Sequence, residues 1–182
     1  MSASEHFQQV IEGAVMSVDV IAAAIEIAAG TITHSLLHGG TLYCCAAGCD
    51  RSLAQLTADR LMYPVDSDRP ALPAVALTAA GPAGPDASPW RDVRALVRDG
   101  DSLLCIDSSR EGRLLEQAIT SISDRGVQLL GLTHTGIEDI DSAGKYTIIA
   151  LPGDARSRIL GLQALALNCL CTLIEHRLFG EA

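Results

Sequence analysis

The stretch that decides the fold is Gly39-Gly-Thr-Leu-Tyr-Cys-Cys-Ala-Ala-Gly48-Cys-Asp-Arg-Ser-Leu-Ala-Gln-Leu-Thr-Ala-Asp59. The apolar run at 42–45 follows a glycine pair and predicts a buried parallel strand. Gly48 then marks a sharp turn, and Asp50 or Ser52 can cap the helix that follows. Such turns often hold anions, because glycine lets the backbone approach and the helix N-terminus offers free N–H groups. With one glycine, no lysine and an acidic Asp50, this turn has the frame of a phosphate-binding loop without most of its chemistry.

Apolar runs and helical periodicities alternate along the rest of the chain. We expect further strands at 74–77, 102–106, 127–133 and 145–151, and helices at 51–62, 90–97, 113–125 and 155–178. Residues 78–89 contain several Gly and Pro residues and predict a loop. Strands that alternate with helices indicate βαβ units and hence an α/β protein with a parallel sheet. Ligands of such sheets bind at the carboxyl ends of the strands, here the turns at 46–52 and 107–113.

A long amphipathic helix is predicted over residues 4–30, with Ser4 as its cap and Gly30 as its stop, and one or two more helical turns at 32–37. A helix of this length before the first strand is unusual for a parallel α/β sheet. We expect it to pack against another subunit, although covering one face of the sheet is a compatible role.

Length and composition favour one soluble domain. The 182 residues suffice for a single core, which we divide into N-terminal helices at 1–38, a parallel α/β core at 39–151 and a C-terminal helix at 152–182. Hydrophobic residues make up 48% of the chain and aromatic residues only 3%, which indicates a core of Ala, Leu, Ile and Val. The formal net charge of −9 argues against direct binding of nucleic acid.

The cysteines are predicted to be buried free thiols in a reducing cytosol. They are Cys44, Cys45, Cys49, Cys105, Cys169 and Cys171. Their spacing does not match a zinc site, and we expect no metal and no cofactor. Glu5 and His6 precede any apolar run, so no signal peptide is expected, and the apolar stretches look too short or too interrupted to cross a bilayer. These features favour a cytoplasmic protein without a membrane partner.

Four segments together resemble the SIS-domain (sugar isomerase domain) family. They are Leu42-Tyr-Cys-Cys45, Arg69-Pro-Ala-Leu-Pro-Ala-Val-Ala-Leu77, Gly100-Asp-Ser-Leu-Leu104 and Leu167-Asn-Cys-Leu-Cys-Thr-Leu-Ile-Glu-His-Arg-Leu-Phe179. The resemblance covers nearly the whole chain. It implies a three-layer sandwich, in which helices flank a five-stranded parallel sheet, with a long N-terminal helix for oligomerisation. Two branches are similar: the phosphoheptose isomerases (GmhA) and the non-enzymatic DnaA initiator-associating proteins (DiaA).

At the positions of the family's sugar-phosphate site, this sequence differs from the pattern of the SIS family. Asp50 stands where the first phosphate turn of these families has its key serine, and the second turn carries Asp107 and Glu111 beside its two serines. Carboxylates oppose an anion hole. We therefore predict a vestigial phosphosugar site made of Gly48, Cys49, Asp50, Ser108, Ser109 and Gly112. The acidic residues could instead form a cation site, but we favour helix caps at a surface turn. Arg51 or Arg110 could restore anion binding by reaching into the crevice.

The isomerase branch binds a divalent metal and uses imidazole and carboxylate groups for proton transfer. The matching positions here are Leu56, Arg60, Leu160 and Asn168. Leucine cannot ligate a metal, arginine opposes a cation, and no positioned base remains for proton abstraction. The resemblance therefore implies no catalytic residues and no enzyme activity. His134 and His176 have no partner pattern and are expected to be exposed.

The resemblance to the DnaA initiator-associating branch implies a non-catalytic, symmetric oligomer that binds DnaA and promotes its assembly at the replication origin. DnaA would then make the DNA contacts. Leu178 and Phe179 either contact that partner or pack back on the sheet. The alternative is a phosphoheptose isomerase-like enzyme or a phosphosugar-binding or sensing module with a diverged site. A third possibility is a SIS scaffold for another partner, and both a dimer and a tetramer remain open.

Overall fold

The computed structural model describes residues 2–65, 68–78, 89–134, 146–153 and 155–180. In chain order the elements are α1 (Ala3–Leu37), β1 (Leu42–Ala46), the short 3₁₀ helix η1 (Gly48–Asp50), α2 (Arg51–Met62), β2 (Ala74–Leu77), α3 (Trp90–Leu96), β3 (Ser102–Ile106), α4 (Arg113–Ile122), β4 (Gln128–His134), β5 (Thr147–Leu151) and α5 (Arg156–Phe179). The five strands are parallel and lie in the order β2-β1-β3-β4-β5.

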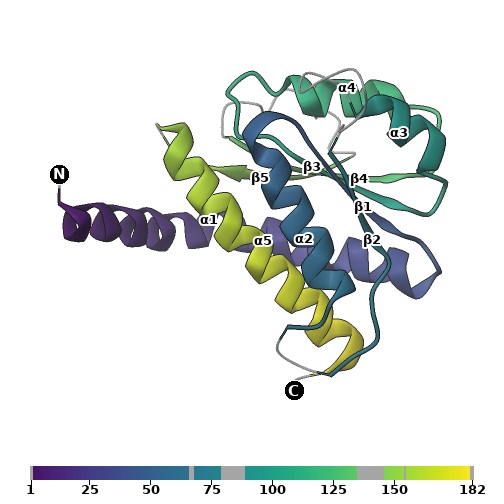
Figure 1. Ribbon diagram of the computed structural model, residues 1–182, viewed down its shortest axis with the longest axis horizontal. Helices are drawn as coiled ribbons and strands as arrows, with labels where there is room; N and C mark the ends of the chain where they lie inside the picture. Colours follow the sequence, from purple (N-terminus) through teal and green to yellow (C-terminus); the bar gives the residue numbers. More distant parts are fainter. Residues whose placement is uncertain (1, 66–67, 79–88, 135–145, 154, 181–182) are drawn as a thin grey trace.

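The sheet is the middle of three layers (Figure 1). Helices α1, α2 and α5 cover one face, where Leu104 and Leu130 of the sheet pack in one core cluster with residues of all three helices. Helices α3 and α4 cover the other face around Leu103 and Leu129. Consecutive residues of a strand point to opposite faces, which is why neighbouring leucines serve different clusters. The predicted α/β sandwich with its five-stranded parallel sheet is confirmed.

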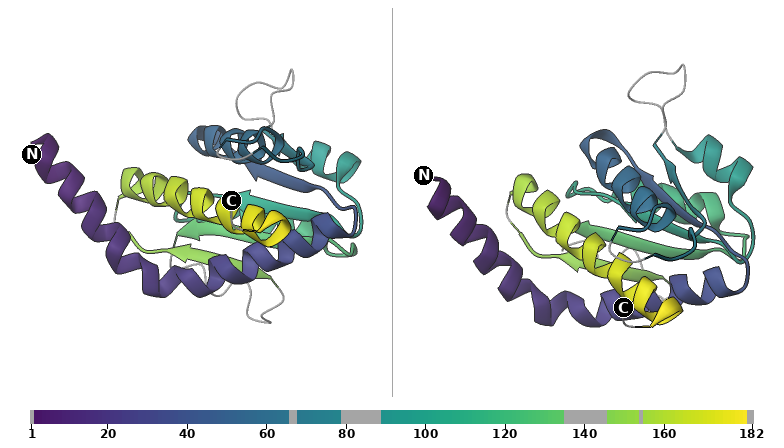
Figure 2. Two further views of the ribbon diagram at one scale, coloured as in Figure 1. Left: turned by 90° about the horizontal axis from the view of Figure 1, so that it is seen from below. Right: turned by 60° about the horizontal axis from the view of Figure 1, so that its bottom comes forward.

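Helix α1 is one continuous helix, so the predicted stop at Gly30 was wrong. It begins at a capping box in which Ser2, rather than Ser4, caps the helix and pairs with Glu5. A Cβ atom on Gly30 would lie 2.7 Å from Nη1 of Arg177, so the end of this α5 side chain lies against the helix at Gly30. The helix ends before Gly39, whose positive φ of 82° suits glycine. Figure 2 shows that the N-terminal part of α1 projects beyond the sheet.

The other boundaries agree closely with the sequence pattern. Strands β2 and β3 have the predicted bounds, and helix α4 ends three residues earlier than expected. Most of the loop expected at 78–89, and most of the segment before β5, lie outside the described residues.

Two helices contradict the expectation that the apolar stretches are too short or too interrupted to cross a bilayer. By length and composition alone, α1 and α5 are each apolar enough to span a membrane. Core helices pass the same test, and these two helices supply residues such as Ile32 and Ile159 to one core cluster.

The prediction of buried thiols holds for four cysteines and is wrong for two. Cys44, Cys45, Cys105 and Cys171 are buried, whereas Cys49 of η1 and Cys169 of α5 are exposed. Burial raises the pKa of Cys44 well above its usual value and raises the pKa of Cys171 to about 12. The pKa of Cys105 is also raised, first by a hydrogen bond with Cys45 and then by burial.

Candidate functional site

The two turns singled out in the sequence lie side by side. Strands β1 and β3 pair in register up to Ala46 and Ile106, so their carboxyl ends deliver the turns to the same edge of the sheet. Gly48 and Gly112 have φ values of 59° and 60°, which only glycine adopts freely. The carboxylate of Asp107 accepts hydrogen bonds from the backbone N–H groups of Ser109 and Leu114, at 2.8 and 3.3 Å, and so satisfies one free N–H group in the first turn of α4. Asp107 is buried and the N-cap of α4 is Gly112, so the predicted cap at a surface turn was wrong for Asp107.

Asp50 does not cap its own helix, so the prediction of a surface cap was wrong for this residue. Its side chain makes no capping hydrogen bond to α2 and is buried, at 3% exposure. Oδ2 accepts hydrogen bonds from the backbone N–H of Ser108 at 2.9 Å and from the hydroxyl of Ser108 at 3.0 Å. The Asp50 carboxylate of the first turn therefore occupies the hydrogen-bond donors that Ser108 offers in the second turn.

Arg156 provides a cation at this site that the sequence reasoning missed. Its Nε donates to Oγ of Ser108 at 2.8 Å, and its Nη2 lies 3.7 Å from Oδ2 of Asp50. Arg51, which was considered for this role, instead donates from Nε to the carbonyl oxygen of Gly48 at 3.0 Å. One signal was available in the sequence: Arg156 begins a helix, where the helix dipole disfavours a positive charge unless an anion compensates it.

A cavity of about 270 Å³ opens beside this network. Gly48, Asp50 and Ser109 of the predicted site line it together with Arg113 and Arg156. The predicted members Cys49, Ser108 and Gly112 are not among the lining residues. The cavity carries charged groups of both signs, and each side chain of the Asp50–Ser108–Arg156 network already has a partner within the protein.

The positions matched to the isomerase chemistry lie on α2 and α5. Arg60 donates from Nη1 to Oδ1 of Asn168 and from Nη2 to Oγ1 of Thr172, the latter at 2.8 Å. Leu56 is exposed and Leu160 is half-buried. Over the part of the chain that the structure describes, no group of three or more His, Cys, Asp or Glu side chains could hold a metal ion. Two of the four positions thus join the helices through a hydrogen bond.

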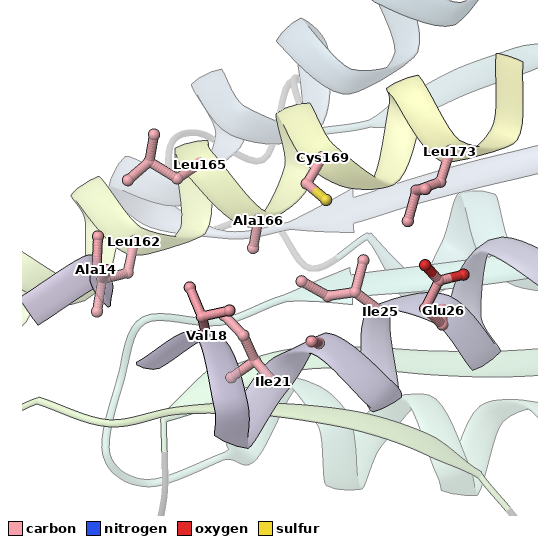
Figure 3. A pocket seen from close by; sticks show the side chains of 11 residues that line it. Ala14, Val18, Ile21, Ile25, Glu26, Leu162, Leu165, Ala166, Cys169 and Leu173 are labelled. Carbon is pink, nitrogen blue, oxygen red and sulfur yellow. The ribbon is translucent and has the colours of Figure 1, made fainter. Parts of the chain in front are cut away.

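A second cavity, of about 310 Å³, is an apolar groove between α1 and α5. Figure 3 shows Val18, Ile21 and Ile25 of α1 facing Ala166 and Cys169 of α5 across it. Glu26 is the one charged residue among those that line the groove. The prediction that α1 offers an apolar face is consistent with this groove.

The two residues of the C-terminal pair, Leu178 and Phe179, differ in their burial. Leu178 is half-buried and packs against the core cluster, whereas Phe179 is 47% exposed. His176 is exposed, as predicted. His134 is buried, contrary to the prediction, and its Nε2 lies 2.6 Å from the carbonyl oxygen of Gly153, so the ring joins β4 to the segment after β5.

Comparison with curated proteins finds similarity along almost the whole chain. The DnaA initiator-associating protein DiaA of Yersinia enterocolitica is 31% identical over 183 residues, which cover 95% of this chain and 93% of that protein. DiaA of Citrobacter koseri gives the same values. No protein-family model matches the chain.

Solved structures share the fold. A phosphoheptose isomerase from Francisella tularensis aligns with a TM-score of 0.82 and 23% identity, over 97% of this chain and 100% of that one. Phosphoheptose isomerase GmhA from Neisseria gonorrhoeae aligns with a TM-score of 0.81 and 23% identity, over 94% and 96% of the two chains. The sugar isomerase domain of an RpiR transcription factor from Sphaerobacter thermophilus aligns with a TM-score of 0.67 and 18% identity, over 94% and 88%. At these identities the likeness concerns the fold alone.

Proposed function

The chain belongs to the family of the DnaA initiator-associating protein DiaA, and on that premise we propose that it binds DnaA and promotes DnaA assembly at the replication origin without catalysing a reaction. The observation that carries the proposal is the similarity to DiaA over nearly the full length of both proteins. The acidic chain agrees with an indirect role at DNA, in which DnaA makes the DNA contacts. Cytoplasmic localisation follows from the same proposal.

We include in the proposal that the protein does not catalyse a reaction. This part rests on the residues at the four positions that match the metal-binding and proton-transfer residues of the isomerases. Arg60 is engaged by Asn168 and Thr172, and its charge opposes a divalent cation. Leu56 and Leu160 supply no ligand atom. A proton transfer next to a carbonyl group needs a positioned base, which these four side chains do not offer.

We further propose a homo-oligomer of single SIS domains, held by residues 1–38 and the C-terminal helix. Large apolar side chains of α1, including Phe7, Ile11 and Val15, are exposed on the part that projects from the sheet. Together with the groove between α1 and α5, they offer an apolar surface that a second copy of the chain would cover. An oligomer presents several copies of one DnaA-binding surface, which raises the effective concentration of DnaA molecules relative to one another.

Phe179 is the residue that we propose for direct contact with DnaA. It is an exposed aromatic side chain at the end of α5, whereas its neighbour Leu178 packs on the core and supports the helix end. Aromatic side chains often dominate interface energies because they bury a large area at low entropic cost.

Calorimetric titration with purified DnaA tests this proposal. The wild-type protein should bind DnaA, and Phe179→Ala should weaken the affinity at least about tenfold, in line with the loss of an interface hot spot. Leu96→Ala is the matched control, because Leu96 is 48% exposed but lies on α3, on the opposite face of the sheet. If wild-type protein does not bind DnaA, the partner is wrong. If both variants bind like wild type, Phe179 is not part of the contact surface.

The cavity at the strand ends favours one alternative, a phosphosugar-binding or sensing module or an isomerase with a diverged site. Ser109, Arg113 and Arg156 there could contact a phosphorylated sugar. Titration with sedoheptulose 7-phosphate, followed by an assay for its turnover, separates this alternative from the main proposal. Saturable binding by the wild-type protein would bring the alternative forward, whereas no binding would contradict it and leave the roles that depend on a protein partner.

A further inference from the structure

We propose that the carboxylate of Asp50 is a built-in anion that fills an anion-binding site, and that the site takes a phosphate group once this carboxylate is removed. This inference concerns the cavity at the strand ends and does not depend on binding of DnaA. It identifies Asp50 as the residue that sets the ligand specificity of the cavity.

The donors of the site converge on one point. Oδ2 of Asp50 accepts the backbone N–H and the hydroxyl of Ser108, at 2.9 and 3.0 Å, and the guanidinium of Arg156 lies 3.7 Å away. Arg156 is also fixed by Ser108, whose Oγ accepts its Nε–H at 2.8 Å. A backbone N–H, a hydroxyl and a guanidinium are the donor set that proteins use for oxyanions such as carboxylate and phosphate. The group bound here comes from the chain itself.

Burial makes this occupant effective. The Asp50 side chain is 3% exposed and reaches the second turn from the first, so it stays on these donors without the entropic cost of capturing a free ligand. An external phosphate would have to displace it or lie next to it, and two like charges at such a separation repel strongly where water is scarce. The cavity of about 270 Å³ next to Asp50 leaves room for a larger anion when the carboxylate is gone.

The position of Arg156 at the start of α5 is independent support for the same inference. The residue begins α5, where the partial positive charge of the helix N-terminus disfavours a cation. Its side chain is half exposed, yet it is directed to Ser108 and Asp50. With Asp50 replaced, the positive charge of Arg156 lacks this compensating carboxylate and favours binding of an anion.

The test measures binding of inorganic phosphate to the full chain by calorimetry and by the shift in melting temperature. Wild-type protein should show no saturable binding at millimolar phosphate, whereas Asp50→Ser should bind with an affinity at least about tenfold higher than wild type. The double variant Asp50→Ser with Arg156→Ala should lose this gain. Asp59→Ser is the matched control, because Asp59 is exposed on helix α2, which begins directly after Asp50, and its replacement changes the net charge equally.

Circular dichroism verifies that each variant is folded, and Asp50→Asn replaces Asp50→Ser if the latter is not. Phosphate binding by wild-type protein equal to that of the Asp50 variant would overturn the inference, because the carboxylate would not be blocking the site. A folded Asp50 variant without phosphate binding would overturn it as well. An equal gain in Asp59→Ser would show that net charge, and not the built-in carboxylate, controls the affinity.

Discussion

Replacement of Arg69 by alanine tests how the C-terminal ends of α2 and α5 are held together. Arg69 is buried, at 2% side-chain exposure, and its Nη2 forms an ion pair of 2.6 Å with Glu175, which is 13% exposed. The guanidinium also donates to the carbonyl oxygens of Arg60, Leu61 and Pro70 at 2.9–3.0 Å. Two of these carbonyls lie in the last turn of α2, where the helix itself offers no donor.

The expected cost follows from these contacts. Removing one partner of a buried ion pair typically costs about 3–5 kcal/mol, because the remaining charge is left buried and unpaired. For a chain of this length we therefore expect a loss of about 4 kcal/mol and a drop in melting temperature of about 8–16 °C. Urea denaturation at fixed protein concentration should show a lower midpoint with an unchanged slope.

The exposed pair Arg113–Glu111 is the internal control for this experiment. Its Nε–Oε2 distance is 2.9 Å, close to that of the buried pair, but its side chains are 76% and 64% exposed. Arg113→Ala should therefore cost less than about 1 kcal/mol. Equal effects of Arg69→Ala and Arg113→Ala would refute the reasoning, since the buried pair and the three carbonyl hydrogen bonds of Arg69 are expected to contribute more than the exposed pair.

Three further predictions follow from the groove and the cysteines. Val18→Glu, which places a charge in the apolar groove, should dissociate the oligomer while the fold is kept, as measured by light scattering; unchanged mass would place the contact elsewhere. A thiol reagent should modify Cys49 and Cys169 in the folded protein, and the other four thiols only after denaturation. Because Cys169 lines the groove, Val18→Glu should accelerate its modification. Because burial raises the pKa of Cys171 to about 12, its contribution to stability should be complete below about pH 9 and be lost as the pH rises toward 12. Denaturation across this range should show a shallower alkaline decline for Cys171→Ala, and an identical slope would contradict the assignment.

The strands could be predicted within one or two residues because each is an apolar run bounded by glycine, proline or polar residues. Ser102–Ile106 is such a case: Asp99-Gly-Asp precedes it and Asp107 follows it. The continuity of α1 could not be predicted, because Gly30 has the local signature of a helix end. In the structure Gly30 lies inside the helix, and the end of the Arg177 side chain, which is distant in sequence, lies against it.

The same limit applies to the candidate site. The two turns and the charge of Asp50 are readable from the sequence, and the order of the parallel strands brings the turns together. The direction of the Asp50 side chain depends on Ser108, and the compensating charge comes from Arg156, which is more than 100 residues from Asp50. From the sequence alone, the negative charge of Asp50 predicts that phosphate is repelled. The structure shows in addition that the Asp50 carboxylate binds the Ser108 donors and Arg156.

This network gives a physical reason why the turns can keep their shape without a ligand. A buried backbone N–H group without an acceptor is costly, and the Asp50 carboxylate accepts the N–H of Ser108 from within the chain, while Arg156 forms an ion pair with the same carboxylate at 3.7 Å. Arg156 begins α5 and Phe179 ends it, so the cavity and the proposed contact surface lie about 36 Å apart along one helix of 24 residues. Substitutions at such distances act independently as a rule. Asp50→Ser should therefore leave the affinity for DnaA unchanged, and Phe179→Ala should leave the phosphate binding gained by Asp50→Ser intact; coupling between the two would mean that α5 transmits the state of the cavity to the partner surface.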